Sequence, residues 1–357
     1  MPNFPIIDTH LHVWDQTRLK YAAFDGHPLF GHPYHVEDYQ KDCGALDIEA
    51  MVFLECYADY WPGGGQYIQE IEFVESEAKR DPRLKYSAFD GHPLYGHPYH
   101  VEDYQRDCGA LDIEAMVFLE CYADFWPGGG QYIEEILFVE DEARRDPRIK
   151  GIVPMAPLEW GEKVRPLLTQ MQDNHPTVKG IRRIVEFDAN PRALTLSDDF
   201  VAGVNLLNDF GYSFDINVHY TQMDIVREFV PRVSCPLILD HCGKPGIRQG
   251  AIDQYRDDMK ALSRHKNLWI KLSDLPVTAD PETWTEDDLR PFIAATLEAF
   301  GPDRVIYAGD YPICLAATTL TRWVEVLDRA FADLGLSDTE TRKIYRDNAN
   351  RFYRLGL

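Results

Sequence analysis

The second half of the chain alternates short apolar runs with helical patterns, and this alternation constrains the fold most. After Arg148 six apolar segments occur in turn, at residues 149–155, 178–185, 212–220, 236–242, 267–273 and 304–310. A helical pattern follows each of them, and one is bounded by Ser197 as N-cap and Gly211 as stop. The apolar segment at 4–12 and one of the two identical segments EAMVFLEC, at 49–56 or 114–121, bring the number of strands to eight. Such a pattern predicts a parallel α/β fold, closed as a (β/α)8 TIM barrel that spans residues 1–357.

The first half of the chain contains a repeat. Residues 18–82 and 83–147 align without a gap over 65 residues and differ at eight positions. Each copy carries a short helix, the apolar strand EAMVFLEC, a glycine-rich loop and a longer helix. Repeat folds stack at least three units, so two copies at one end favour a tandem duplication of a βα segment. Removing 65 of the 357 residues leaves 292, enough for one barrel, and we therefore expect one copy to be surplus.

The two copies compete for the second strand position, and one difference between them guides the choice. Glu72 and Leu137 occupy the same helical position, so the second copy offers the broader apolar face. Burial of a leucine is worth ~1.5–3 kcal/mol. We therefore expect the helix from 131 to 145 to pack on the barrel and part of 18–82 to be excluded. The excluded apolar strand would need a partner, which favours a homodimer.

The composition restricts the partners. A formal charge of −23 repels phosphates over the whole surface and excludes nucleic acid as a partner. The chain has neither an apolar run near 18 residues nor a basic, apolar leader, which predicts a cytoplasmic protein that does not bind membranes. None of the seven cysteines forms a CxxC pair, as expected of reduced thiols. A small molecule is the substrate class that remains.

Polar side chains gather at the expected strand ends, where the active sites of such barrels lie. His10 and His12 are two residues apart on one strand, so both face the barrel mouth. His219, His241 and Asp310 end three later strands. Each of these residues alone is more often an ordinary hydrogen-bonded side chain. Together, imidazoles and a carboxylate at four strand ends predict an active centre that suits zinc.

Further polar residues are candidates for contact with the substrate. Arg182 and Arg183 alternate along one strand, so one is expected to face the barrel mouth and the other the helix layer. The full set of expected substrate contacts is Arg182, Arg183, Trp14, Lys244, Tyr57 and Tyr122.

Five short motifs carry a resemblance to a known family. They are IIDTHLHVWD from Ile6, LILDHCGKP from Leu237, WIKLS from Trp269, YAGDYP from Tyr307 and NANRFYRL from Asn348. These motifs resemble the amidohydrolase superfamily, most closely its branch of lactone hydrolases. That branch includes sugar lactonases, sulfomuconolactone hydrolase and pyrone-dicarboxylate lactonase. The resemblance covers the chain from end to end, except for one copy of the repeat.

The resemblance implies a hydrolase that opens a small sugar-acid or carboxylated lactone. It implies that Asp310 activates water as a general base and that His241 orients the carbonyl. His10, His12, His219 and Asp310 would hold one divalent metal ion, zinc first, or the histidines would bind substrate where no metal is present. The branch usually has a glycine where this chain has Asp274. This carboxylate near the substrate pocket means that the resemblance does not define which lactone is the substrate. A nonoxidative decarboxylase of the same superfamily, or a barrel impaired by the duplication, are the alternatives.

Overall fold

The computed structural model describes residues 6–11, 51–53, 84–86, 100–120 and 132–357. The chain divides into two compact units. The first unit comprises residues 1–12, 101–120 and 139–357, and the second comprises residues 13–100 and 121–138. The first unit holds the candidate site. The division into one barrel with a surplus copy stays a prediction.

Eight parallel strands form the framework of the first unit. The first sheet has the order β1-β4-β5, with β1 (Ile6–Leu11), β4 (Ile113–Leu119) and β5 (Ile149–Val153). The second sheet runs β10-β9-β8-β7-β6, with β6 (Gly180–Arg182), β7 (Ser213–Ile216), β8 (Leu237–Leu239), β9 (Leu268–Leu272) and β10 (Val305–Tyr307). Parallel bridges Ile152–Val178 and Met155–Arg182 connect β5 to the β6 side. The predicted parallel α/β fold is confirmed.

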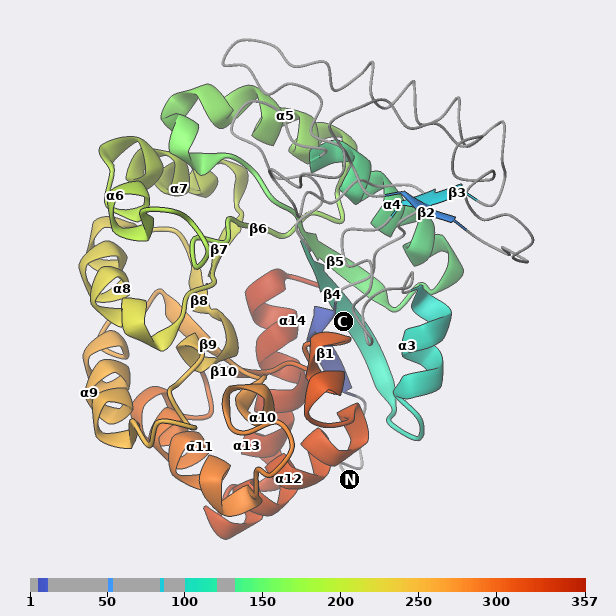
Figure 1. Ribbon diagram of the computed structural model, residues 1–357. Helices are drawn as coiled ribbons and strands as arrows, with labels where there is room; N and C mark the ends of the chain where they lie inside the picture. The colour runs from blue at the N-terminus through green and yellow to red at the C-terminus, as the bar shows by residue number, and fades with distance from the viewer. Residues whose placement is uncertain (1–5, 12–50, 54–83, 87–99, 121–131) are drawn as a thin grey trace, which may run out of the picture. The chain divides into compact units, whose positions relative to one another are not determined.

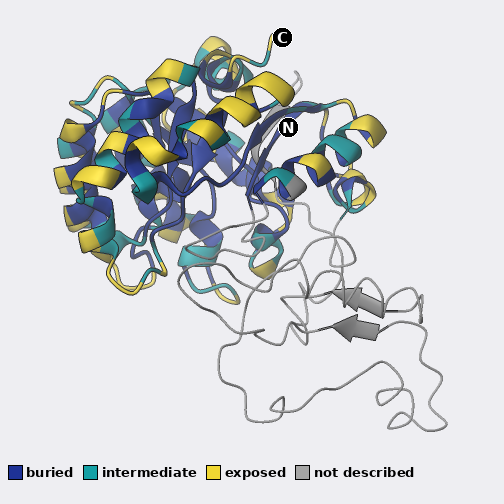
Figure 2. Ribbon diagram, turned by 90° about the horizontal axis from the view of Figure 1, so that it is seen from above, coloured by how far each residue is buried: buried dark blue, intermediate teal, exposed yellow. Residues whose placement is uncertain are grey.

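Helices cover the outside of these strands (Figure 1), and their exposed faces point away from the buried strands (Figure 2). The α-helices are α3 (Val101–Asp107), α4 (Tyr132–Arg145), α5 (Arg165–Asn174), α6 (Pro191–Thr195), α7 (Asp198–Phe210), α8 (Met223–Phe229), α9 (Ile252–Leu262), α10 (Leu275–Thr278), α11 (Glu286–Phe300), α12 (Leu320–Asp333), α13 (Asp338–Arg342) and α14 (Asn348–Tyr353). Short 3₁₀ segments lie at Leu158–Val164, Tyr220–Gln222, Val230–Arg232, Asp240–Gly243 and Ile313–Ala316, and a π-helical turn at Lys343–Asp347. None of the described helices combines the length and apolarity needed to cross a membrane.

The ends of α7 follow from local chemistry. The Ser197 hydroxyl accepts a hydrogen bond from the Phe200 amide at 3.1 Å, which satisfies one free donor of the first turn. Gly211 ends the helix in the left-handed conformation, with φ of 67°, which a glycine adopts without strain. Both predicted ends are therefore confirmed.

One apolar cluster links the two sheets. Val117 and Leu119 of β4 and Val153 of β5 pack in a cluster with Ile238 of β8 and Ile306 of β10. Ala115 of β4 also belongs to this cluster, and the C-terminal helix α14 contributes Ala349, Phe352 and Tyr353. The end of the chain is therefore part of the core that holds the strand ends in place.

The second copy of the repeat supplies the strand between β1 and β5. Its strand β4 pairs with β1 at Ile6–Ile113 and with β5 at Val117–Gly151. The expectation that Leu137 is buried against the barrel is wrong, because this residue is 49% exposed. The buried face of α4 runs through residues such as Ile136 and Val139, which both copies share, and Leu137 lies beside that face.

The apolar strand of the first copy also has a partner. Its segment β2 (Met51–Phe53) pairs in parallel with β3 (Leu84–Tyr86), in the register Met51–Leu84. This pairing lies within one chain, so the strand has a partner without a second copy of the protein. The other expectations for residues 18–82 lie outside the described residues. The homodimer stays a prediction.

We expect deletion of residues 18–82 to keep or raise stability and activity. The deletion leaves β4, which already lies between β1 and β5, with its native connection to the rest of the chain. The measurement compares the thermal midpoint of the shortened and full chains and the rate of the lactone hydrolysis that the sequence motifs lead us to expect. Deletion of residues 83–147 is the matched control, because the remaining copy is identical at all but eight positions. A shortened chain that folds normally but has lost activity would show that the repeat is functional.

Candidate active site

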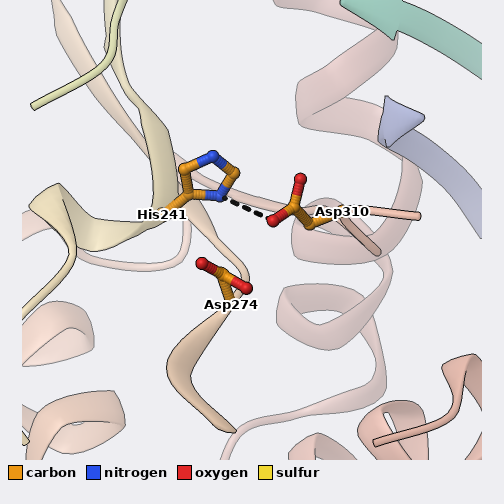
Figure 3. A group of neighbouring side chains, drawn as sticks. All are labelled: His241, Asp274 and Asp310. Carbon is orange, nitrogen blue, oxygen red and sulfur yellow. Dashed lines mark ion pairs between the residues drawn. The ribbon is translucent and has the colours of Figure 1, made fainter. Parts of the chain in front are cut away.

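Three buried side chains converge where neighbouring strands end (Figure 3). His241 follows β8, Asp274 follows β9 and Asp310 follows β10. The His241 Nδ1 atom lies 3.7 Å from the Asp310 Oδ2 atom and 3.0 Å from the hydroxyl oxygen of Ser273. Each of the three residues offers one donor atom, and these atoms all lie within 4.8 Å of one another. The arrangement brings an imidazole and two carboxylates to one point.

The backbone that carries these residues is strained. Positive φ angles occur at His241 (50°), Cys242 (56°), Lys244 (47°), Asp274 (62°) and Asp310 (54°). Residues other than glycine seldom adopt this region, and each such case costs on the order of 1–3 kcal/mol. Strain of this kind persists where the surrounding structure fixes it and is concentrated at functional sites. The turns after three neighbouring strands therefore hold these side chains at a cost in stability, as an active site does.

Asp274 is a buried carboxyl group whose pKa is strongly raised. Its side chain is buried, and its Oδ1 atom has no hydrogen-bond partner among the described residues. Burial and the neighbouring Asp310 carboxylate raise the pKa of Asp274 well above its usual range, although Lys244 opposes this shift. A buried carboxylate next to a second one favours a proton or a cation between them.

A network of buried charges lies beside this group. Arg182 donates to Glu120 Oε1 at 2.8 Å and to Asp240 Oδ2 at 3.2 Å. Lys271 Nζ lies 2.7 Å from Asp215 Oδ2 and 2.8 Å from Asp240 Oδ1. Burial alone would raise the pKa of Asp240, but Lys271 and Arg182 outweigh it and lower that pKa. Because Asp240 directly precedes His241, this network fixes the position of the segment that carries the imidazole.

A cleft of about 390 Å³ opens next to Asp274. Its polar lining includes His219, Tyr220, Lys244, Arg248 and Asp274. The Lys244 ammonium pairs with Glu186 and lies 5.6 Å from the centre of the Phe187 ring, which is 70% exposed. The cleft is large enough for a small polar molecule and reaches the cluster through Asp274.

The structure brings some of the expected site residues together and keeps others apart. His241 and Asp310 are neighbours, and His219 and Lys244 line the cleft. The His219 Nδ1 atom lies 2.9 Å from the Thr221 hydroxyl. The side chain of His10 and the whole of His12, Trp14, Tyr57 and Tyr122 lie outside the described residues.

The two arginines have carboxylate partners of their own. Arg182 belongs to the buried network with Glu120 and Asp240, and Arg183 donates to Glu159 at 3.0 Å. Neither residue lines the cleft that the described residues form. Contact of Arg182 or Arg183 with the substrate therefore stays a prediction.

Sequence reasoning missed the acidic half of the buried network. Glu120, Asp215 and Asp240 each lie within or directly after a largely apolar strand. A carboxylate in such a segment is rarely buried without a partner. Arg182 and Lys271, within or at the end of other strands, supply the matching cations. Opposite charges within several apolar strands were therefore the feature of the sequence that could have predicted this buried network.

Comparison with known proteins decides the family. The model of the amidohydrolase family matches residues 7–355. The chain belongs to the amidohydrolase family. The prediction from the short motifs is thereby confirmed.

Two curated relatives of this amidohydrolase are sugar lactonases. L-rhamnono-gamma-lactonase of Scheffersomyces stipitis is 27% identical and aligns over 99% of this chain and 100% of its own. L-fucono-1,5-lactonase of Burkholderia multivorans is 28% identical over 62% of this chain and 77% of its own.

Two solved structures share the fold. An amidohydrolase from Burkholderia multivorans with bound zinc has a TM-score of 0.66 and 24% identity, covering 74% of this chain and 93% of its own. The 2-pyrone-4,6-dicarboxylic acid hydrolase assigned in Pseudomonas putida has a TM-score of 0.58 and 15% identity, covering 74% of this chain and 91% of its own.

Proposed function

We propose that this amidohydrolase opens a small sugar-acid lactone by the attack of water on its carbonyl carbon. The observation that carries the proposal is the buried pair of His241 and Asp310 at two strand ends, in a chain whose curated relatives include sugar lactonases. We further propose that the eight strands close into a (β/α)8 barrel, with the reaction at its C-terminal face.

Asp310 serves as the general base in this proposal. Its carboxylate accepts a proton as the water oxygen bonds to the lactone carbonyl carbon. The ring C–O bond then breaks, and the leaving alkoxide takes up a proton to give a hydroxy acid. His241 orients the carbonyl, and the Ser273 hydroxyl at 3.0 Å fixes the plane of its imidazole. General base catalysis of this kind contributes ~10²–10⁴-fold to the rate.

The side chains fit a divalent metal ion as a cofactor. Imidazole and carboxylate are donors that zinc accepts, and Asp274 Oδ1 is a buried acceptor without a partner among the described residues. We propose that His10, His12, His219 and Asp310 hold the ion, as the sequence motifs imply. A bound ion would polarise the lactone carbonyl and lower the pKa of water. Full activity after treatment with a chelator would show instead that the histidines bind substrate.

A pH-stat assay on the purified chain tests the proposed function. The panel contains L-rhamnono-γ-lactone, L-fucono-1,5-lactone and a carboxylated lactone, and we expect acid release with at least one sugar lactone. An aromatic carboxylic acid forms the second arm, with carbon dioxide as its readout. Carbon dioxide release without lactone hydrolysis would identify the decarboxylase alternative. Inactivity in both arms would favour the impaired barrel.

Two further proposals concern the location of the enzyme in the cell and its oligomeric state. We propose a cytoplasmic location and a homodimer, and only the sequence supports these two proposals. Cell fractionation tests the first, and sedimentation of the full chain tests the second.

A further inference from the structure

Asp274 places a second carboxylate in a site that already contains Asp310. Its side chain is only 6% exposed, and the Oδ1 atom has no hydrogen-bond partner among the described residues. A buried acceptor of this kind is costly unless a proton or a cation satisfies it. Asp274 also lines the cleft, so a small ion can reach it from solvent.

The spacing of the donors fits one metal ion. Ligands about 2.0–2.2 Å from a tetrahedral zinc lie about 3.4 Å apart. His241 Nδ1 and Asp310 Oδ2 are already 3.7 Å apart, and the donor atoms of all three residues lie within 4.8 Å of one another. A small movement of these side chains would therefore bring their donor atoms to the spacing of three ligands on one ion.

The backbone holds Asp274 toward this point. It has φ of 62°, in the left-handed region, and it precedes the short helix α10 (Leu275–Thr278). Glycine adopts this conformation without strain, and aspartate and asparagine tolerate it better than most residues. An aspartate at a position that suits glycine adds backbone strain and a buried charge, and both costs would be offset by a bound cation.

We infer that Asp274 is a metal ligand, and that His241, Asp274 and Asp310 together bind one divalent cation. This inference deepens the metal-binding part of the proposed function. Asp310 belongs both to this group and to the ligand set expected from the sequence, so it would bind the ion as well as serve as the general base. In this inference His241 is a ligand instead of the residue that orients the carbonyl, and its Nδ1 atom would exchange the Ser273 hydroxyl for the ion.

The test measures zinc binding directly, without any lactone. The full-length protein is stripped with a chelator, dialysed and titrated with Zn²⁺ against a chromophoric competitor. The variants are Asp274→Asn and Asp274→Gly, which both remove the carboxylate and both suit a positive φ. We expect the wild-type chain to bind zinc and both variants to bind it at least about 10-fold more weakly. The rise in melting temperature caused by zinc should shrink in parallel.

Asp280→Asn is the matched control. Asp280 lies close to the cleft, pairs with Arg248 at 3.7 Å and is not part of the three-residue group. Its replacement should leave zinc affinity unchanged, and far-UV circular dichroism should show that all variants fold. Unchanged affinity in both Asp274 variants, or a wild-type chain that takes up no zinc, would overturn the inference. Lactone hydrolysis by that same wild-type chain would leave the proposed function standing, so the two failures are distinguishable.

Discussion

Asp310→Asn is expected to abolish lactone hydrolysis while the fold stays intact. The amide has nearly the shape of the carboxylate and tolerates the φ of 54° at this position, but it cannot accept a proton from water. Loss of the base should lower kcat by at least ~10²–10⁴-fold. The rate is measured by pH-stat with a sugar lactone, and the fold by circular dichroism and thermal melting.

Asp303→Asn is the control for this experiment. Asp303 pairs on the surface with Lys343 at 2.7 Å, precedes β10 whereas Asp310 follows that strand, and does not line the cleft. The same chemical change there should leave the rate unchanged. Near-normal turnover in purified Asp310→Asn protein would show that Asp310 is not the general base.

Lys271→Met should destabilise the protein by ~3–5 kcal/mol. Lys271 is fully buried and lies within 2.8 Å of both Asp215 and Asp240, so its replacement leaves two buried carboxylates without their shared cation. Methionine has a similar length, which keeps the loss of packing small. The free energy of unfolding is measured by urea denaturation at neutral pH.

Lys343→Met provides the comparison for Lys271→Met. It breaks an exposed ion pair with Asp303, and such pairs contribute only ~0–1 kcal/mol. A loss at Lys271 no larger than the loss at Lys343 would show that the buried network does not hold the strand ends in place.

The elements that the sequence predicts well are those that local chemistry determines. The cap at Ser197 and the stop at Gly211 depend on neighbours within one turn. The meeting of His241 and Asp310 follows from a parallel sheet, because its strands all end at the same edge. Local pattern and strand direction were therefore enough to predict that these two side chains meet.

The features that escaped prediction depend on contacts between distant segments. The bond from Arg182 to Glu120 joins residues 62 positions apart, and no periodic pattern reveals such a partner. The exposure of Leu137 was also not predictable from the sequence. An apolar residue beside the buried face of a helix fits the same periodic pattern as the residues within that face. The sequence also could not predict which copy of the repeat supplies the strand between β1 and β5, because segment 114–121 is identical to segment 49–56.

Hydrolysis in water enriched in ¹⁸O tests the central claim most directly. Water attack on the lactone carbonyl predicts one ¹⁸O atom per turnover in the carboxylate of the product, read by mass spectrometry of the hydroxy acid. Asp310→Asn protein should produce labelled acid at least ~10²–10⁴-fold more slowly than the wild-type protein. Wild-type protein that forms acid without label in the carboxylate, or no faster than the uncatalysed reaction for every lactone in the panel, would contradict the account.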